Sequence, residues 1–282
     1  MIPGPGTLYV VATPIGNLGD LSPRAAEVLR SVRAVAAEDT RRTLKLFAHL
    51  GAPPPALLSL PAFDEAGRTD AIVARLLAGE DVALCTDAGT PGVSDPGEKL
   101  VAAAWAAGAR VVPIPGPSAA LAALAASGLP ADRFVFAGFL PRKGAGRVET
   151  LAWLAAQPAT LVLYEAGNRT AQTLRDLAAA LGDRPAVVAR ELTKLHEELA
   201  RGTLTALAER FAGEVRGEVT LVVGGAGEAP PRAPEETLEA ELARRLAAGE
   251  PPTSIAREVA RARGLRRGDV YEALERLKRT PR

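Results

Sequence analysis

Residues 82–97 read VALCTDAGTPGVSDPG, an apolar run that gives way to a loop of small residues with two aspartates and no lysine or arginine. A short apolar run bounded by glycine and proline is typical of a buried strand in a parallel sheet. In open parallel sheets, ligands bind at the carboxyl ends of the strands. The loop therefore occupies a position suited to a ligand, although turns of this composition also occur without one.

Similar apolar runs alternate with helix-period segments along the first part of the chain. We expect helices between them, one opening at the Ser22-Pro23 pair and others over residues 65–78 and 98–107. Strands separated by helices indicate a mainly parallel sheet covered on both faces. The sequence therefore predicts an α/β domain over residues 1–117, with strands at residues 8–13, 34–37, 57–60, 82–86 and 111–114.

After Gly128 the alternation restarts, which predicts a second α/β domain over residues 118–226. Residues 224–234, GGAGEAPPRAP, have the composition of a linker. Beyond them, residues 235–282 form a small helical appendage in this interpretation. The second domain is expected to contain strands at residues 134–139, 160–164, 185–192 and 218–223, and helices at residues 148–156, 170–181 and 204–211.

The appendage resembles a helix-turn-helix, with Thr253 or Ser254 capping one helix, Gly264 ending it and Asp269 capping the next. Residues 251–282 contain nine Lys and Arg against four Asp and Glu, a net charge of +5. Contact with a nucleic acid and a solvated basic face both explain this excess. The two interpretations remain open from the sequence.

The composition of the chain limits its function classes. Lys plus Arg (34) nearly equals Asp plus Glu (33), so the total charge favours no partner. The single cysteine, Cys85, excludes an internal disulfide, and we expect a buried thiol in a reducing compartment. The absence of a signal-like leader or a long apolar run predicts a cytoplasmic protein without a membrane segment. Two histidines, without an HExxH motif or a cysteine cluster, predict no metal site.

The loop at residues 86–97 also limits the ligand. The chain has no GxxxxGK[ST] phosphate loop and no GxGxxG dinucleotide fingerprint. We therefore expect the ligand to be bound by backbone groups, small hydroxyls and carboxylates. Such a ligand carries ribose hydroxyls and a positive charge in place of phosphates. S-adenosylmethionine has these properties.

Eight blocks occur in this order along the chain: TLYVVATPIGNLGDLSPRA, AEDTRRT, CTDAGTPGVSDPG, IPGPSA, FAGFLPRKGAGR, LYEAGNRT, ARELTK and RGEVTLVV. Together they resemble the ribosomal RNA small subunit methyltransferase I family of the tetrapyrrole-methylase-like class. The resemblance runs from about Gly6 to Gly224. It implies two α/β domains of the class III S-adenosylmethionine methyltransferase type, with the methyl donor between them, and a homodimer. It also implies methylation of the ribose 2′-hydroxyl of a decoding-centre cytidine in 16S ribosomal RNA, with the RNA contained in the small ribosomal subunit.

The resemblance assigns the donor site to small residues in both domains, which let the backbone approach a ligand closely. Asp87 either pairs with the ammonium of the donor or holds the loop. Residues 13–17, TPIGN, are expected to face the same cleft. The implied donor-binding residues are Asp87, Gly89, Thr90, Pro91, Val93, Ser94, Ser118, Ala119, Tyr164 and Leu192.

A ribose hydroxyl becomes a good nucleophile only when its proton is removed. Candidate bases are Lys194 and Glu165, taken as a set, together with Asp39. Glu38, Glu191 and Glu197 are further titratable candidates. An ion pair at a domain seam is the alternative role for each of them. The block SLPAFDEAGR has Phe63 and Asp64 where the family commonly has polar residues including histidine, so a histidine base from that block is absent here.

RNA contact is expected from a basic loop, residues 141–147, at the end of a predicted strand. As a surface turn, this loop would need no function. Two rival functions stay open: a methylase of a precorrin-like small molecule, and a non-enzymatic regulator that binds nucleic acid through the helical appendage. The expected RNA-binding residues are Arg41, Arg42, Arg142, Lys143, Arg147 and Arg169, with Lys194 beside them.

Overall fold

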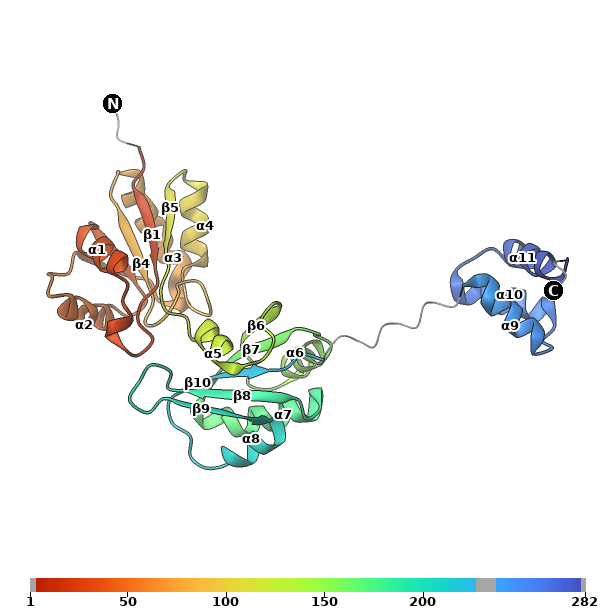
Figure 1. The fold of residues 1–282 in the computed structure, drawn as a ribbon. Coiled ribbons are helices and arrows are strands. Elements are labelled where there is room, and N and C mark those ends of the chain that lie inside the picture. The colour runs from red at the N-terminus through yellow and green to blue at the C-terminus, as the bar shows by residue number, and fades with distance from the viewer. Residues whose placement is uncertain (1–3, 227–236, 280–282) are drawn as a thin grey trace. The chain divides into compact units, whose positions relative to one another are not determined.

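The computed structural model describes residues 4–226 and 237–279 (Figure 1). Its contacts divide the chain into two compact units, residues 1–227 and 228–282. The first unit contains two five-stranded sheets. Both sheets carry helices, so the fold class is α/β, as predicted.

The first sheet is entirely parallel and has the strand order β3-β2-β4-β1-β5. Side chains of alternate strand residues enter two different apolar clusters. Leu84 packs on the side of α3 and α4, whereas Ala83 and Cys85 pack on the side of α1 and α2. The sheet is therefore covered on both faces. Its elements are β1 (Thr7–Val11), α1 (Pro23–Ser31), β2 (Ala34–Ala37), α2 (Thr40–Leu50), β3 (Ala56–Ser59), α3 (Glu65–Leu77), β4 (Val82–Cys85), α4 (Glu98–Ala106) and β5 (Arg110–Ile114), with short 3₁₀ turns η1 (Leu18–Asp20) and η2 (Ala62–Asp64).

Parallel strands bring the loops after β1, β2, β4 and β5 to one edge of this sheet. The loops after β1 and β4 are joined directly, because Thr13 and Gly89 exchange backbone hydrogen bonds of 2.9 and 3.0 Å. The loop quoted above therefore lies at the carboxyl edge of the sheet.

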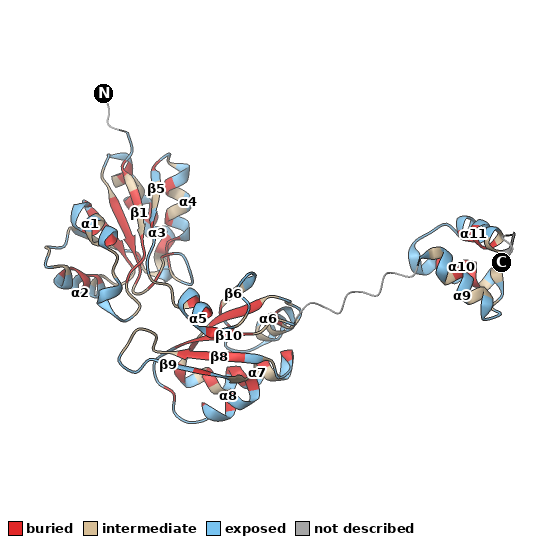
Figure 2. Ribbon diagram, in the orientation of Figure 1, coloured by how far each residue is buried: buried red, intermediate tan, exposed pale blue. Residues whose placement is uncertain are grey.

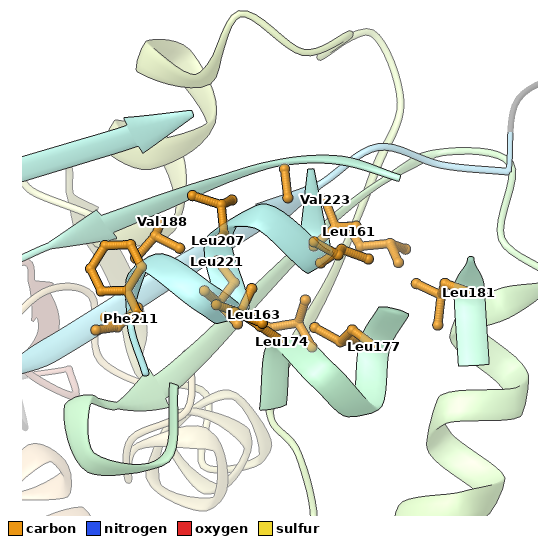
Figure 3. Close-up of a cluster of buried hydrophobic side chains, with 14 of the residues drawn as sticks. Leu161, Leu163, Leu174, Leu177, Leu181, Val188, Leu207, Phe211, Leu221 and Val223 are labelled. Carbon is orange, nitrogen blue, oxygen red and sulfur yellow. The ribbon is translucent and has the colours of Figure 1, made fainter. Parts of the chain in front are cut away.

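The second sheet has the order β6-β7-β10-β8-β9, and only β6 and β7 run parallel. Leucines of β7 and α7 form much of its core (Figure 3). Strand β9 was not predicted, because ELARGT contains only one residue type that is enriched in strands, Thr203, and forms a strand through its pairing with β8. The elements are β6 (Phe134–Phe139), α6 (Ala145–Ala155), β7 (Thr160–Ala166), η3 (Gly167–Arg169), α7 (Thr170–Leu181), β8 (Pro185–Arg190), β9 (Glu198–Thr203), α8 (Leu204–Arg210) and β10 (Glu218–Val223).

Helix α5 (Ala119–Ser127) follows the last strand of the first sheet but packs on the second sheet. Ala123 and Leu124 lie against Val162, Val187 and Val222 of that sheet. The chain therefore crosses between the two sheets at residues 115–118. The amino terminus of α5 lies at this crossing, where the Ser118 side chain caps the helix.

The second unit contains α9 (Leu238–Ala247), α10 (Pro252–Arg263) and α11 (Arg267–Arg279) around an apolar core of its own, which includes Leu242, Val259 and Leu274 (Figure 2). Gly264 ends α10 with a φ of 64°, as the sequence indicated. The predicted amino-terminal caps are wrong. Helix α10 starts at Pro252, whose ring fixes a helical φ, and Asp269 lies inside the first turn of α11.

Residues 227–234 of the predicted linker lie outside the described residues, and so does the expected helix start at residue 235. Within the described part of the chain, no helix combines the length and the apolarity needed to span a membrane.

Candidate active site

A cavity of about 400 Å³ lies between the carboxyl edge of the first sheet and strands β6, β7 and β10 of the second. Both halves of the first unit contribute residues to it. Eight of the ten expected donor-binding residues line this cavity: Asp87, Gly89, Thr90, Val93, Ser94, Ser118, Ala119 and Tyr164. Of the other two, Pro91 is buried beneath the loop, and Leu192 lines an adjoining cavity of about 40 Å³ together with Ile15 and Lys194.

The backbone of the quoted loop is bent sharply where it borders the cavity. Gly89 has a φ of 83°, and the non-glycine residue Ser94 also has a positive φ, 63°. A non-glycine residue in this region is strained and is found most often at functional sites. Residues 13–17 border the same space, since Ile15 lines both cavities and the Asn17 amide donates a 3.0 Å hydrogen bond to the Thr193 hydroxyl.

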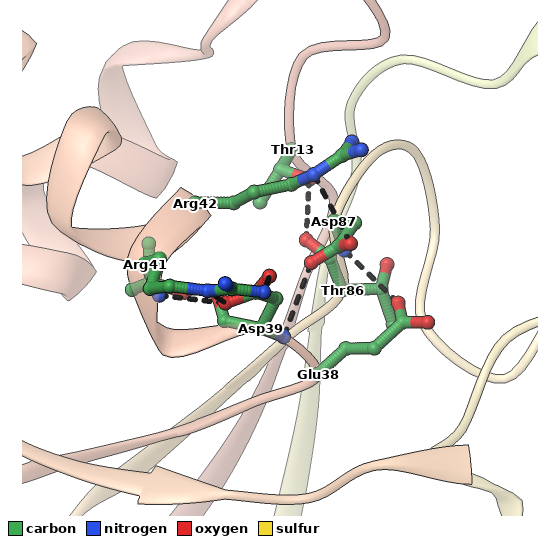
Figure 4. Close-up of polar contacts among 8 residues, drawn as sticks. Thr13, Glu38, Asp39, Arg41, Arg42, Thr86 and Asp87 are labelled. Atoms are coloured by element: carbon green, nitrogen blue, oxygen red, sulfur yellow. Dashed lines mark hydrogen bonds and ion pairs between the residues drawn. The ribbon is translucent and has the colours of Figure 1, made fainter.

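Glu38, Asp87 and Arg42 form a polar cluster at one wall of the cavity (Figure 4). The Asp87 amide donates to Glu38 at 3.2 Å, and the Asp87 carboxylate accepts from the Asp39 amide at 3.1 Å. Arg42 Nε lies 3.2 Å from the other Asp87 oxygen. The Asp87 carboxylate therefore ties the loop after β4 to the start of α2, which is the loop-holding role considered for it.

Asp95, the second aspartate of the quoted loop, also lines the cavity, and the sequence analysis assigned it no role. Burial raises the pKa of the Asp95 carboxyl to about 7, and the nearby charge of Glu38 acts in the same direction. A carboxyl group with a pKa near neutrality is well suited to accept a proton under physiological conditions. The sequence contains a signal for it, because Asp95 belongs to the same strand-end loop as the donor residues.

Glu165 borders the cavity, but its carboxylate is fully engaged in internal contacts. The side chain is 1% exposed and pairs with Arg169. One of its oxygens also accepts from the Ala166 amide at 2.8 Å, and the other accepts from the Thr173 hydroxyl at 2.7 Å. These bonds make Glu165 the polar anchor between β7 and α7.

Lys194 and Asp39, the other two expected catalytic residues, lie outside the lining of the main cavity. Lys194 Nζ lies 2.8 Å from Glu191 and 2.9 Å from Glu218. Burial lowers the pKa of Lys194, but its bonds to the two carboxylates outweigh that effect and raise it overall. Asp39 caps α2 and binds Arg41, whose hydrogen bond lowers the pKa of Asp39 to about 2. Neither group is suited to removing a proton at neutral pH.

The expected RNA-binding residues separate into paired and unpaired cations. Arg41 binds Asp39, Arg169 binds Glu165, and Arg147 binds Asp176 at 2.7 Å. Arg42 lines the cavity beside Asp87. Arg142 and Lys143 are exposed in the loop between β6 and α6, and the structure gives them no ion pair within residues 4–226. These two cations are therefore the ones free to meet phosphates.

The cavity lining is predominantly acidic. Five carboxylates line it, and among the described lining residues Arg42 is the only cation; the carboxylates belong to Glu38, Asp87, Asp95, Glu165 and Glu218. Residues 4–226 and 237–279 contain no cluster of histidine, cysteine and carboxylate side chains able to hold a metal ion. Such a lining fits a cationic ligand with small polar groups better than it fits a phosphate ester.

This fold is shared by a known class of methyltransferases. The sequence profile of tetrapyrrole (corrin/porphyrin) methylases matches residues 7–208. A uroporphyrin-III C-methyl transferase of Thermus thermophilus complexed with S-adenyl homocysteine superposes with a TM-score of 0.57 at 21% identity, covering 78% of this chain and 98% of that one. Diphthine synthase superposes with a TM-score of 0.59 at 17% identity, covering 78% and 90%. The fold and the match place the chain in the tetrapyrrole methylase class.

Relatives of much higher sequence identity show to which family within this class the chain belongs. Ribosomal RNA small subunit methyltransferase I of Xylella fastidiosa (strain Temecula1) is 49% identical over 275 residues, which cover 95% of this chain and 98% of the relative. The protein of the same name from a Synechocystis strain is 48% identical, covering 95% and 96%. The chain belongs to the ribosomal RNA small subunit methyltransferase I family.

Proposed function

We propose that this protein transfers a methyl group from S-adenosylmethionine to the ribose 2′-hydroxyl of a cytidine in the decoding centre of 16S ribosomal RNA. The observation that carries the proposal is the shared cavity, where a glycine-bearing loop, an acidic lining and a carboxyl group of near-neutral pKa meet. Relatives at 43–49% identity over nearly the whole chain are named for ribosomal RNA, which supports this substrate over a tetrapyrrole.

The donor fits the residues present. S-adenosylmethionine supplies a methyl group that is already activated on a positively charged sulfur. Gly89, Thr90, Ser118 and Ala119 line the cavity, and Tyr164 lines it from the second sheet. The acidic lining favours the positive charges of this ligand, and small residues allow close approach of the backbone.

We assign the general base to Asp95. Its carboxyl group lines the cavity and loses its proton near pH 7, so a large fraction is ready to accept the proton of the ribose hydroxyl. Such a base contributes a factor of about 10² to 10⁴ to the rate. Holding the hydroxyl and the donor in line contributes more, up to about 7–11 kcal/mol in favourable cases. Glu165, Lys194 and Asp39 act in this proposal as structural residues.

The partner in this proposal is 16S ribosomal RNA assembled in the small subunit, and the protein acts in the cytoplasm as a homodimer. The unpaired cations Arg142 and Lys143 support contact with RNA phosphates. The homodimer is implied by the family resemblance. Light scattering tests it by measuring the molar mass of the purified protein in solution.

Two measurements test the function. Titration calorimetry is expected to detect binding of S-adenosylmethionine to the purified chain. We expect small ribosomal subunits from cells lacking the gene to gain one ribose methylation when they are incubated with the protein and the donor. The modified position is mapped by the resistance of its phosphodiester linkage to alkaline cleavage. Donor binding without any methylation of ribosomal RNA would contradict the proposed substrate, and methylation of a tetrapyrrole would replace it.

A further inference from the structure

Phe139 is an exposed aromatic side chain inside a cavity whose other lining residues are mostly small or charged. It is 54% exposed, although a phenylalanine at the end of a sheet strand usually packs into the core. Its ring centroid lies 5.6 Å from that of Tyr164, and the two rings are tilted by 57°. Phe139 takes no part in the proposed donor site or proton transfer.

A β-bulge directs this ring into the cavity. The pairing of β6 with β7 shifts between Phe136 and Gly138, so Ala137 is an extra residue in β6. Residues 136 and 139 would face opposite sides of a regular strand, because side chains alternate. With the bulge, Phe136 lies opposite Val162 and Phe139 opposite Tyr164, which share one face of β7. Bulges beside active sites commonly re-aim a side chain in this way.

The bulge depends on Gly138, which lies against Ser94 of the loop at residues 86–97. Gly138 has a φ of 58°, and a Cβ atom at this position would come within 2.9 Å of the Ser94 hydroxyl oxygen. The position of Tyr164, whose ring packs against Phe139, is also fixed. Tyr164 is held by a hydrogen bond from the Ala120 amide to its hydroxyl at 3.3 Å, and it packs edge-on against Phe136 at 5.0 Å. The Phe139 ring therefore rests on a rigid support.

The chain next to Phe139 carries the unpaired cations. Leu140 is buried and anchors the end of the strand, and the exposed Arg142 and Lys143 follow within four residues of Phe139. An aromatic face beside a flexible basic loop is the usual arrangement for binding single-stranded nucleic acid, in which bases stack on rings and cations meet the backbone. The methyl donor has no phosphate, so this pairing of ring and cations points to the RNA.

We propose that Phe139 is the stacking platform for the base of the target nucleotide, which leaves the RNA stack and lies on this ring while Arg142 and Lys143 hold the flanking phosphates. This inference rests on the proposed function and extends it to the RNA subsite. Extrusion of a nucleotide lets its ribose enter a recessed site, and stacking on an aromatic ring is a sequence-tolerant way to hold the extruded base.

The test uses full-length Phe139→Leu, Phe139→Tyr and Phe134→Leu. Leucine keeps an apolar side chain but removes the aromatic face, whereas tyrosine keeps the ring. Phe134 is the matched control, because it lies on the same strand, is 40% exposed and does not line the cavity. Each variant is assayed for the affinity of S-adenosylmethionine by calorimetry, and for methyl transfer to small subunits from cells lacking the gene. A third assay measures quenching of a pyrrolocytidine placed at the target position of an RNA fragment.

We expect Phe139→Leu to raise the KM for subunits at least about fivefold and to reduce the quenching, given the usual energy of stacking one base. Phe139→Tyr and Phe134→Leu are expected to behave like the wild-type protein, and all variants to bind the donor equally. A Phe139→Leu variant with wild-type KM and quenching would overturn the stacking role while leaving the proposed function intact. Loss of donor affinity alone would assign the ring to the adenine and also overturn it. A wild-type protein that binds the donor but methylates no subunit would remove both proposals.

Discussion

At the scale of single residues, the site is governed by which charged side chains already have partners. Glu165 and Lys194 are each held by two or more internal contacts, whereas Asp95 borders the cavity with a pKa raised to about 7. Catalysis by proton transfer needs a group that is free to change its charge. The structure therefore favours Asp95 as the base over the residues chosen from the sequence.

The first prediction concerns Asp95→Asn. We expect the rate of methyl transfer to fall by about 10² to 10⁴, with donor affinity retained, because the amide cannot accept the proton. In the wild-type protein, the rate should rise with pH through about 7 as Asp95 loses its proton. Single-turnover rates between pH 5.5 and 9 measure both effects. A rate that is flat over this range, or a variant as fast as the wild type, would exclude Asp95 as the base.

The raised pKa of Asp95 also predicts how the free energy of unfolding depends on pH. The pKa of Asp95 is higher in the folded chain than the ordinary value of 3.8, so the folded state binds the proton more tightly than the unfolded state. Stability is therefore lost as the pH rises from about 4 to 7. Asp95→Asn removes this loss and is expected to be more stable than the wild type at pH 8, with a smaller difference at pH 4. Urea denaturation at the two pH values measures the change; a less stable variant at pH 8 would contradict it.

Glu165→Ala separates a structural role from a catalytic one. The substitution leaves Arg169 and Thr173 without their buried acceptor and is expected to lower the free energy of unfolding by about 2–3 kcal/mol. Donor binding should persist below the unfolding transition. Urea denaturation and calorimetry test this together. Normal stability with lost methyl transfer would instead restore Glu165 as a catalytic residue.

At the scale of elements, the carboxyl edge of the first sheet and the strand ends of the second supply different parts of the site. The loops after β2 and β4 form an acidic wall of Glu38, Asp87 and Asp95, whereas β6 and the loop after it supply an aromatic ring and unpaired cations. The acidic wall suits a cationic donor, and the basic loop suits a polyanion. The two ligands are therefore separated by charge within one cavity and its rim.

Reversing the charge of the basic loop tests this separation. Arg142→Glu together with Lys143→Glu is expected to weaken RNA binding and to reduce the slope of log affinity against log salt by about 1.4 to 1.8, if each cation meets one phosphate. Donor affinity should stay unchanged. The matched control is Arg33→Glu with Arg110→Glu, because these exposed residues lie at the amino-terminal edge of the first sheet. Equal slopes for the two double variants would exclude the loop from phosphate contact.

At the scale of the whole molecule, the chain combines a two-sheet unit, which contains the whole cavity, with a separate helical unit that has its own core. Every residue lining the cavity lies between residues 15 and 220. The helical unit contributes no described residue to the donor site. Its basic residues therefore keep the two interpretations that the sequence offers, contact with a nucleic acid and a solvated face.

Removal of the helical unit tests this division. A chain ending at residue 226 is expected to bind S-adenosylmethionine with the dissociation constant of the full-length protein, because it keeps the entire cavity and both sheets. Calorimetry measures the affinity, and circular dichroism checks that the shortened chain is folded. A folded but non-binding truncation would contradict the assignment of the donor site to the first unit.

The sequence by itself determined the alternation of strands and helices, the position of the glycine-rich loop at a strand end, and eight of the residues that line the main cavity. These depend on local patterns and on the rule that parallel strands align their carboxyl ends. Only the tertiary structure decided that β9 is a strand and that a bulge turns Phe139 into the cavity. It also decided that Glu165 and Lys194 form ion pairs and that burial raises the pKa of Asp95 to about 7. Burial, ion pairing and strand register depend on distances in space between residues far apart in the chain, and no local pattern encodes those distances.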